Sequence, residues 1–220
     1  MKVAHSIKVQ YETITNPERA RECLHNLPEV FSADFETAVR YSNKQKEEAK
    51  LKMVDESLPK LERIAYQAVA KATALGHPSH CTITHCSIAI SDREAYVFII
   101  DNQEMADVVL DFLVETERKQ IWHNYSYDGR FLRYYAAGDA KNVEDTQVFA
   151  KTLVNHVDVL KAGVGLKQLM QAYYGDWGIS SDNFTLAQQY EEHVIKYAAI
   201  DACATFKLWE LLNEFVEENK

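Results

Sequence analysis

The sequence lacks several features that would place it in other classes of protein. It has no run of about 18 consecutive apolar residues, and no apolar segment with a basic flank opens the chain, so we expect no membrane span, membrane partner or signal peptide. Its four cysteines are scattered without the spacing of a disulfide framework, which is typical of a reducing compartment and predicts a cytoplasmic location. No repeat or Gly/Ser-rich linker divides the chain, so we predict one domain over residues 1–220.

Positive charge is also scarce. The chain has 24 Lys and Arg residues against 33 Asp and Glu residues, which gives a formal net charge of −9. A protein that binds a nucleic-acid backbone non-specifically uses a basic surface, so this balance argues against such binding. It remains compatible with a small acidic site at which metal ions bring in a phosphate.

Strands and helices are both predicted, and they alternate along much of the chain. The predicted strands cover residues 7–14, 30–37, 82–90, 95–100, 120–124 and 142–144. The predicted helices cover residues 17–27, 103–117, 128–136, a segment from 146, 165–174 and much of the chain from 186. A turn at 91–94 joins two strands into a hairpin. This pattern predicts the α/β class, with a mixed β-sheet flanked by helices.

Residues 40–80 differ in character from their surroundings. A charged segment at 44–50 is followed by Ser57-Leu58-Pro59, which opens a helix whose apolar residues continue to Leu75 before Gly76 ends it. No motif with catalytic chemistry occurs here. We therefore interpret the block as a helical insertion between the strand at 30–37 and the hairpin, and its apolar face as a surface for a partner.

Two acidic residues end the strand at 30–37. Asp34 and Glu36 are two positions apart, so they point to the same face of a strand. A buried unpaired carboxylate is costly, so the pair must reach solvent, basic partners or a hard cation such as Mg²⁺ or Mn²⁺. An Asp-x-Glu pair alone is also compatible with a strand that runs out into a polar loop.

Two further stretches place acids at defined points of predicted helices. Asp128 follows a strand that ends in Asn124 and begins a helix, where helix capping is an alternative explanation. Tyr197 and Asp201 are at positions i and i+4 of one helix face, and an ordinary surface tyrosine and acid are the alternative there.

Taken together, the three stretches resemble the Asp-Glu-Asp-Asp exonuclease superfamily in its tyrosine subclass. The pattern Asp-x-Glu, Asn-x-x-x-Asp and Tyr-x-x-x-Asp is matched by Asp34, Glu36, Asn124, Asp128, Tyr197 and Asp201. The likeness is closest to the 3′–5′ proofreading exonuclease domain of family A DNA polymerases, and it extends to segments 144–146, 165–169 and 198–205. It implies a ribonuclease H-like fold. Asp34 and Asp128 are 94 positions apart (128 − 34), longer than expected for the family, and the helical insertion accounts for the excess.

The resemblance also implies a two-metal phosphodiesterase site. Four converging carboxylates would repel one another unless cations lie among them, and two Mg²⁺ or Mn²⁺ ions about 3.5–4 Å apart act on phosphodiesters. By resemblance, Asp34 would bridge the two ions, Glu36 and Asp201 would lie on the nucleophile's side, and Asp128 would hold the second ion. Tyr197, whose phenol is a poor base, would orient the attacking water.

The resemblance further assigns residues to the substrate and suggests partners. Asn124 and Tyr127 would hold the terminal nucleotide, and Thr37 would bind its sugar through the backbone. The expected substrate is the 3′ end of single-stranded DNA, cleaved to nucleoside 5′-monophosphates, and a DNA polymerase subunit is a second expected partner for proofreading. A ribonuclease D-like 3′–5′ exoribonuclease and a non-catalytic nucleic-acid-binding module of the same fold are the alternatives. The ribonuclease group usually continues into a helical RNA-binding domain, whereas this chain ends 19 residues after Asp201 (220 − 201).

Two other groups of residues have rival interpretations. A zinc site could use the His and Cys residues at 77–86, but their spacing is not that of a recognised finger, and a strand explains 82–90 better. The lysines at 44, 46, 50 and 52 could contact phosphates, but the interleaved Glu47 and Glu48 favour a solvated helix face.

Overall fold

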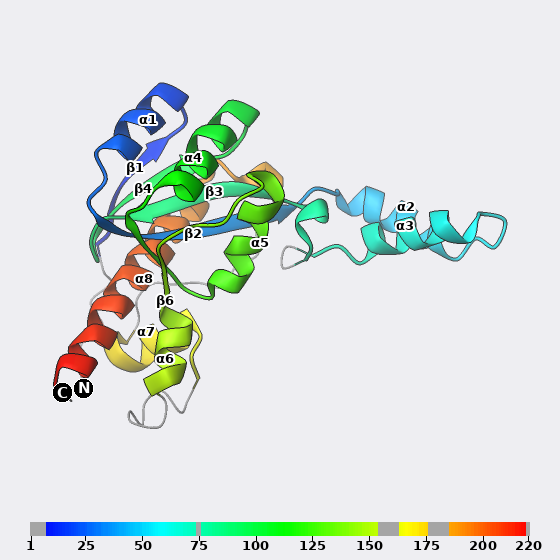
Figure 1. Cartoon of the computed structure of the whole chain (residues 1–220). Helices are drawn as coiled ribbons and strands as arrows, with labels where there is room; N and C mark the ends of the chain where they lie inside the picture. The colour runs from blue at the N-terminus through cyan, green and yellow to red at the C-terminus, as the bar shows by residue number, and fades with distance from the viewer. Residues whose placement is uncertain (1–7, 74–75, 154–162, 176–184, 219–220) are drawn as a thin grey trace.

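The computed structural model describes residues 8–73, 76–153, 163–175 and 185–218. At its centre lies a mixed sheet in the order β1-β4-β3-β2-β5-β6 (Figure 1). The strands are β1 (Gln10–Ile14), β2 (Val30–Val39), β3 (Cys81–Ala89), β4 (Glu94–Ile99), β5 (Lys119–Trp122) and β6 (Val143–Asp145). β3 runs antiparallel to β2 and β4, and the other neighbouring pairs are parallel. The predicted α/β class, a strand near the start of the chain and the hairpin are confirmed.

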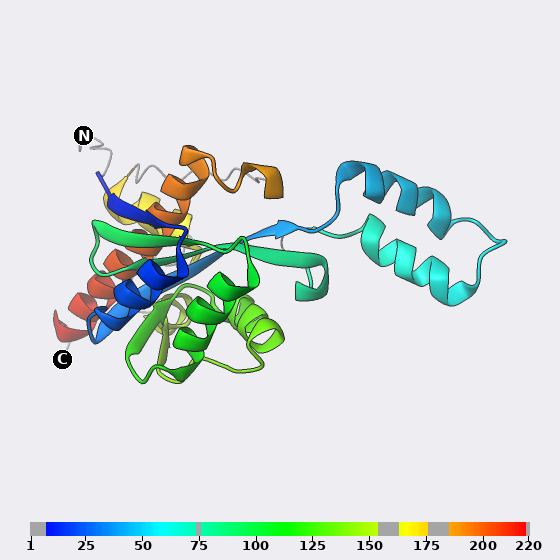
Figure 2. The same cartoon turned by 90° about the horizontal axis from the view of Figure 1, so that it is seen from above.

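Helices cover both faces of this sheet (Figures 1 and 2). The helices are α1 (Pro17–His25), α2 (Asn43–Met53), α3 (Lys60–Ala70), α4 (Gln103–Glu115), α5 (Tyr125–Tyr135), α6 (Thr146–Leu153), α7 (Leu166–Tyr174) and α8 (Glu192–Glu218), with short 3₁₀ turns η1 (Pro78–His80) and η3 (Leu186–Gln188). One core cluster joins the sheet to α1, α4 and α5, and a second joins its other face to α8. Among the described residues, no helix has the length and apolar content to cross a membrane.

The alternation of residues in β2 determines what each face of the sheet carries. Phe31, Ala33 and Phe35 are buried in the cluster formed with α1 and α4. Because side chains alternate along a strand, Asp34 and Glu36 point to the opposite face, which α8 covers. One strand therefore supplies apolar packing on one side and carboxylates on the other.

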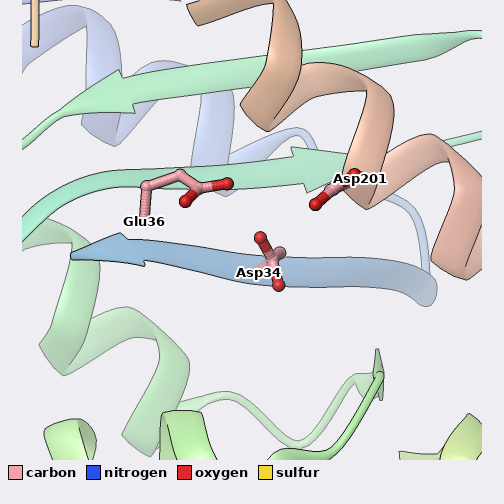
Figure 3. Close-up of side chains that lie close together, drawn as sticks. All are labelled: Asp34, Glu36 and Asp201. Atoms are coloured by element: carbon pink, nitrogen blue, oxygen red, sulfur yellow. The ribbon is translucent and has the colours of Figure 1, made fainter. Parts of the chain in front are cut away.

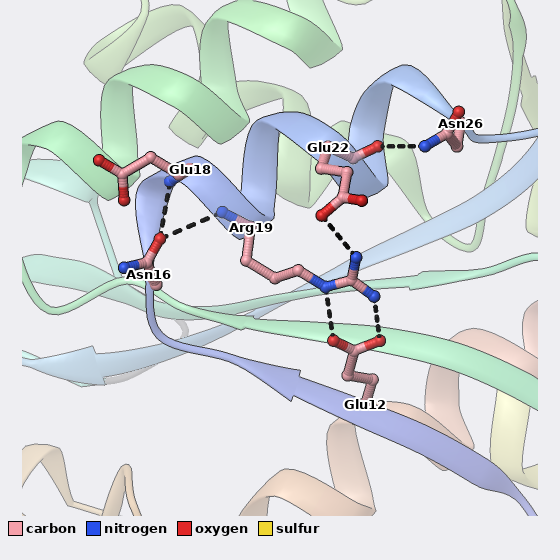
Figure 4. Close-up of polar contacts among 6 residues, drawn as sticks. All are labelled: Glu12, Asn16, Glu18, Arg19, Glu22 and Asn26. Atoms are coloured by element: carbon pink, nitrogen blue, oxygen red, sulfur yellow. Dashed lines mark hydrogen bonds and ion pairs between the residues drawn. The ribbon is translucent and has the colours of Figure 1, made fainter.

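The first helix begins as its sequence predicts and is tied to the edge strand. The Asn16 side chain accepts hydrogen bonds from two backbone N–H groups of the first turn of α1, a cap worth about 1 kcal/mol. Arg19 of this helix bonds both carboxylate oxygens of Glu12 on β1 at 2.8 Å and also reaches Glu22 at 2.7 Å (Figure 4). The Arg19–Glu12 pair joins α1 to the edge strand β1.

The insertion is a pair of helices, α2 and α3, which we call the arm. It projects from the end of β2 away from the sheet (Figures 1 and 2). Part of its predicted apolar face is exposed, because Leu61 and Ile64 are 81% and 50% accessible to solvent. Helix α3 was predicted to reach Leu75 but ends at Ala70. After Ala70 the chain is bonded to α2, because Lys46 Nζ donates to the carbonyl of Ala72 at 2.7 Å. Leu75 lies outside the described residues.

Candidate active site

Three carboxylates from two elements converge on the α8 side of β2. Asp34 and Glu36 come from β2 and Asp201 from α8, and one oxygen of each lies within 4.8 Å of the others (Figure 3). Oxygen ligands at this separation can share divalent cations. Within the described ranges this is the one group of three or more Asp, Glu, His or Cys side chains able to hold a metal, so the segment 77–86 forms no zinc site there.

Asp128 reaches the same region because one edge of β2 is open. β2 pairs with β3 along most of its length but with β5 only over residues 30–32. Past this point, the backbone N–H of Phe35 donates to Asp128 Oδ1 at 3.3 Å. Asp128 is almost fully buried and lies close enough to Asp34 for their charges to interact. The structure thus brings the fourth predicted carboxylate beside the other three.

Small residues allow α8 to bring Asp201 close to the sheet. Ala198, Ala199 and Ala202 are fully buried against β3 and β4. The buried Ser32 hydroxyl of β2 donates to the carbonyl of Ala202 at 2.7 Å. This hydrogen bond fixes Asp201 relative to the strand that carries Asp34.

The start of α5 differs from its prediction, and Asp145 explains the difference. The helix begins at Tyr125, so Asp128 lies within its first turn and does not open it. Asp145 Oδ1 accepts from the backbone N–H of Asn124 at 3.0 Å and of Gln147 at 2.8 Å, and Oδ2 accepts from that of Tyr125 at 2.9 Å. One carboxylate therefore caps both α5 and α6. Sequence analysis placed Asp145 in the family-like segment 144–146 but did not predict that it caps two helices.

Loss of this double cap is expected to destabilise the protein. We expect Asp145→Ala to lower the free energy of unfolding by about 2–4 kcal/mol, since two helix starts lose an acceptor and partly buried N–H groups are left unpaired. Asp145→Asn keeps one acceptor oxygen and is expected to cost less. Urea unfolding of the three proteins measures the difference, and equal midpoints would show that the cap contributes no stability.

Burial and mutual repulsion disfavour the charged form of the acids. Desolvation, followed by the charges of the neighbouring carboxylates, raises the pKa values of Asp34 and Glu36 well above their usual range. Burial also raises the pKa of Asp128 to about 8 and that of Asp201 to about 6. Among the described residues, the buried Asp201 Oδ1 has no hydrogen-bond partner. A bound cation would supply that partner and offset the repulsion, so the donor set fits a divalent metal ion.

Tyr197 lies beside the acids and is held by a lysine that sequence analysis missed. Lys167 Nζ donates to Tyr197 Oη at 2.9 Å and lies 4.8 Å from the centre of its ring. Tyr197 also hydrogen-bonds Asp201, and burial with the nearby negative charges raises its pKa, so the phenol stays protonated. The Lys167 charge opposes the raised pKa values of the acids. Sequence analysis placed Lys167 only within the family-like segment 165–169, so only the fold reveals its contact with Tyr197.

The predicted substrate residues are only partly brought together. Thr37 Oγ1 and Tyr127 Oη are 2.6 Å apart, and Arg130 lies 5.0 Å from the centre of the Tyr127 ring. Burial raises the pKa of Tyr127 to about 12, so the phenol is protonated and either hydroxyl of the pair can donate. Asn124 adopts a left-handed backbone conformation with φ of 63°, and its side chain accepts from Ser126 Oγ at 2.8 Å. Thr37 and Tyr127 form one hydroxyl pair, whereas Asn124 bonds Ser126 through its side chain and Asp145 through its backbone.

A ribonuclease H-like sheet with a carboxylate cluster between a central strand and a covering helix defines a class of metal-dependent nucleases. Folds of this type use divalent metal ions. The chain belongs to the 3′–5′ exonuclease family, because the family model for the exonuclease domain of A-type DNA polymerases matches residues 72–217, more than half of its length. The match includes Asp128, Tyr197 and Asp201 but begins after Asp34 and Glu36, which the structure adds to the same site.

Solved exonuclease structures share this fold at low sequence identity. Brucella melitensis NrnC bound to pGG aligns with a TM-score of 0.62 and 17% identity over 97% of this chain and 84% of that chain. Escherichia coli RNase D, an exoribonuclease involved in structured RNA processing, aligns with a TM-score of 0.59 and 13% identity over 96% of this chain and 46% of that chain. The catalytic core of RRP6 from Trypanosoma brucei gives 0.57 and 11% over 94% and 47%. No curated protein matches the chain in sequence.

Proposed function

We propose that this chain is a metal-dependent 3′–5′ exonuclease that hydrolyses the terminal phosphodiester of single-stranded nucleic acid and releases nucleoside 5′-monophosphates. The observation that carries the proposal is the convergence of Asp34, Glu36 and Asp201, with Asp128 beside them, in a chain of this family. The same acids would be difficult to retain in a binding module, because their repulsion opposes folding.

The resemblance to the family implies a role for each of these side chains. Two Mg²⁺ or Mn²⁺ ions would supply a hydroxide nucleophile and stabilise the leaving 3′ oxygen. Asp34, Glu36, Asp201 and Asp128 would hold these ions. Tyr197 is a hydrogen-bond donor and no base, since its raised pKa keeps it protonated, and it would orient the attacking water while Lys167 holds its oxygen.

The proposed substrate is DNA, with RNA as the second candidate. The family model is that of DNA polymerase exonuclease domains, which supports DNA. RNase D is named as an exoribonuclease and shares the fold, which supports RNA. DNA and RNA differ at the sugar 2′ hydroxyl. The hydroxyl pair of Thr37 and Tyr127 would lie beside the terminal sugar and could distinguish the two.

A proofreading role would add a DNA polymerase subunit as a partner. The exposed apolar side chains of the arm support this part of the proposal, since Leu51, Val54 and Leu61 are 74%, 65% and 81% accessible. Apolar groups at the rim of a projecting element are suited to protein contact. Deletion of the arm that leaves association with a polymerase unchanged would contradict it.

Degradation of 5′-labelled single-stranded DNA and its RNA counterpart, in Mg²⁺ or Mn²⁺, tests the activity. We expect a ladder that shortens from the 3′ end on DNA and disappears in Asp34→Ala/Glu36→Ala. The mechanism requires that chelation by EDTA abolish the ladder as well. A ladder on RNA alone would move the chain to the exoribonuclease group. If neither DNA nor RNA gives a ladder while binding is intact, the chain is a non-catalytic nucleic-acid-binding module.

A further inference from the structure

A groove of about 610 Å³ opens at the base of the arm. One wall is formed by the end of β2 and the start of α2, and the other by residues 185–187, which precede α8. The first wall begins at Val39, three residues after Glu36 on the same strand (39 − 36), which is about 10 Å along an extended chain. The groove therefore starts where the strand that carries the site ends.

The second wall is also tied to the site. His85 Nε2 and the carbonyl of Gln189, two residues beyond the wall, are 2.7 Å apart in a partly buried hydrogen bond. His85 is the residue of β3 that pairs in register with Glu36. Both walls are thus positioned relative to the same point of the catalytic strand, so the groove and the carboxylate cluster keep a fixed relation.

The charge of the groove is opposite to that of the protein. The chain has a net charge of −9, yet the groove is lined by Arg40 and Lys46 and by no acid. Arg40 Nε donates to the carbonyl of Cys81 at 2.8 Å, and Lys46 Nζ donates to that of Ala72 at 2.7 Å. Neither cation has a carboxylate ion pair within the described part of the chain. Neutral acceptors hold both side chains in place, and the Arg40 guanidinium also bonds Tyr135 Oη and lies 5.5 Å from the centre of its ring.

The groove also contains features that suit a nucleic-acid strand. The N-terminal end of α2, capped by Ser42, adds the positive end of a helix dipole. Tyr41 is half-buried and held by a hydrogen bond from or to His80 Nδ1 at 3.2 Å, so its ring is fixed at the wall. Basic grooves with aromatic rings bind single strands by phosphate attraction and base stacking. Sequence analysis favoured a solvated helix face for Lys46, whereas in the structure Lys46 lines the groove.

We propose that this groove binds the phosphodiester strand immediately upstream of the 3′-terminal nucleotide. Lys46 faces its phosphates, Arg40 contributes to the wall, and Tyr41 offers its ring to a base. The inference rests on the proposed exonuclease function and adds to it a substrate-length preference. Oligonucleotides long enough to occupy the groove are used better than a dinucleotide, which fills only the carboxylate site.

Charge reversal in the groove tests the inference on substrates of two lengths. Hydrolysis of 5′-phosphorylated octathymidylate and dithymidylate is measured for the wild type, Lys46→Glu and Lys50→Glu, with the matching uridine oligomers as the RNA arm. Lys50 is the matched control, because it lies on the same helix, pairs with Glu47 and does not line the groove. We expect Lys46→Glu to raise KM for the octamer about tenfold and to reduce its salt dependence by about one phosphate contact, with the dimer unchanged.

The outcomes separate this inference from the proposed function. Equal losses on octamer and dimer, no effect of Lys46→Glu, or the same effect from Lys50→Glu would overturn the groove assignment. Fluorescence anisotropy of a labelled octamer, without metal, provides a readout that is independent of catalysis. If no variant hydrolyses either length but Lys46→Glu alone weakens binding about tenfold, the groove stands and the exonuclease function fails. Thermal melts of the variants confirm that each is folded.

Discussion

Asp34→Asn is expected to lower kcat for 3′ hydrolysis about 10³-fold, which corresponds to the several kcal/mol that a metal ion supplies to the transition state. The same substitution is expected to raise the melting temperature of the metal-free protein. Burial and then the charges of Glu36, Asp128 and Asp201 raise the pKa of Asp34, so a neutral amide of the same shape avoids both the desolvation cost and the repulsion. Opposite changes in activity and stability are typical of a residue that serves the reaction at the expense of the fold.

Single-turnover hydrolysis and calorimetry measure the two effects. Asp111→Asn is the matched control, since it removes one negative charge from an exposed position of α4 outside the site motifs. We expect the control to change neither quantity beyond a small amount. Activity of Asp34→Asn within tenfold of the wild type would remove Asp34 from the metal site. A melting temperature several degrees lower would show that its carboxylate stabilises the fold.

The metal-free protein is also expected to lose stability as the pH rises from about 4 to about 8. Burial raises the pKa of Asp201 to about 6 and of Asp128 to about 8, whereas an unfolded Asp titrates near 4. Between these values the folded state binds more protons than the unfolded state, so its stability is greatest below the unfolded pKa and falls as the pH rises through the folded one. Divalent metal reverses the loss by pairing the ionised carboxylates.

Melting curves at several pH values, with and without Mn²⁺, test this expectation. At about 100 times its Kd, a ligand of the folded state adds about 2.7 kcal/mol, which is roughly 5–10 °C for a domain of this size. The gain should be larger at pH 8 than at pH 6 and small in Asp201→Asn. Comparison of the wild type with that variant at each pH isolates the cluster from other titrating groups. The prediction would be contradicted if the melting temperatures of the wild type and Asp201→Asn differed by the same amount at every pH. An equal gain from Mn²⁺ in the two proteins would also contradict it.

Local rules were sufficient to place the acids, because each lies on an element whose period is visible in the sequence. The two-residue period of β2 put Asp34 and Glu36 on one face, and the helical period put Tyr197 and Asp201 together. The start of α5 was wrong by three residues, since the deciding contact comes from Asp145, which is distant along the chain. Contacts of this kind leave no periodic signal.

Lys167 and the groove show the same limit more strongly. Lys167 joins the site only because α7 packs beside α8 and carries its ammonium group to Tyr197. The groove needs the end of β2 and residues 185–187 to meet, and their separation in sequence hides this proximity. Family resemblance supplied the residues with recognisable spacing, whereas residues recruited by tertiary packing required the structure.

The way the arm joins the sheet has a consequence for how such chains diverge. Val39 and Cys81, the last pair of β2 and β3, face each other, and beyond them the N–H of Arg40 donates to the carbonyl of His80 at 3.0 Å. The two strands thus meet as a closed hairpin, and the arm occupies the place of its turn. Doubling the length of a loop adds only about 0.6 kcal/mol to the free energy of closing it. Insertions of very different size can therefore replace this turn while the register of the catalytic strand is retained. Evolution can therefore remodel substrate handling here independently of the chemistry, and the linear distance between the first two acidic motifs carries little information about kinship.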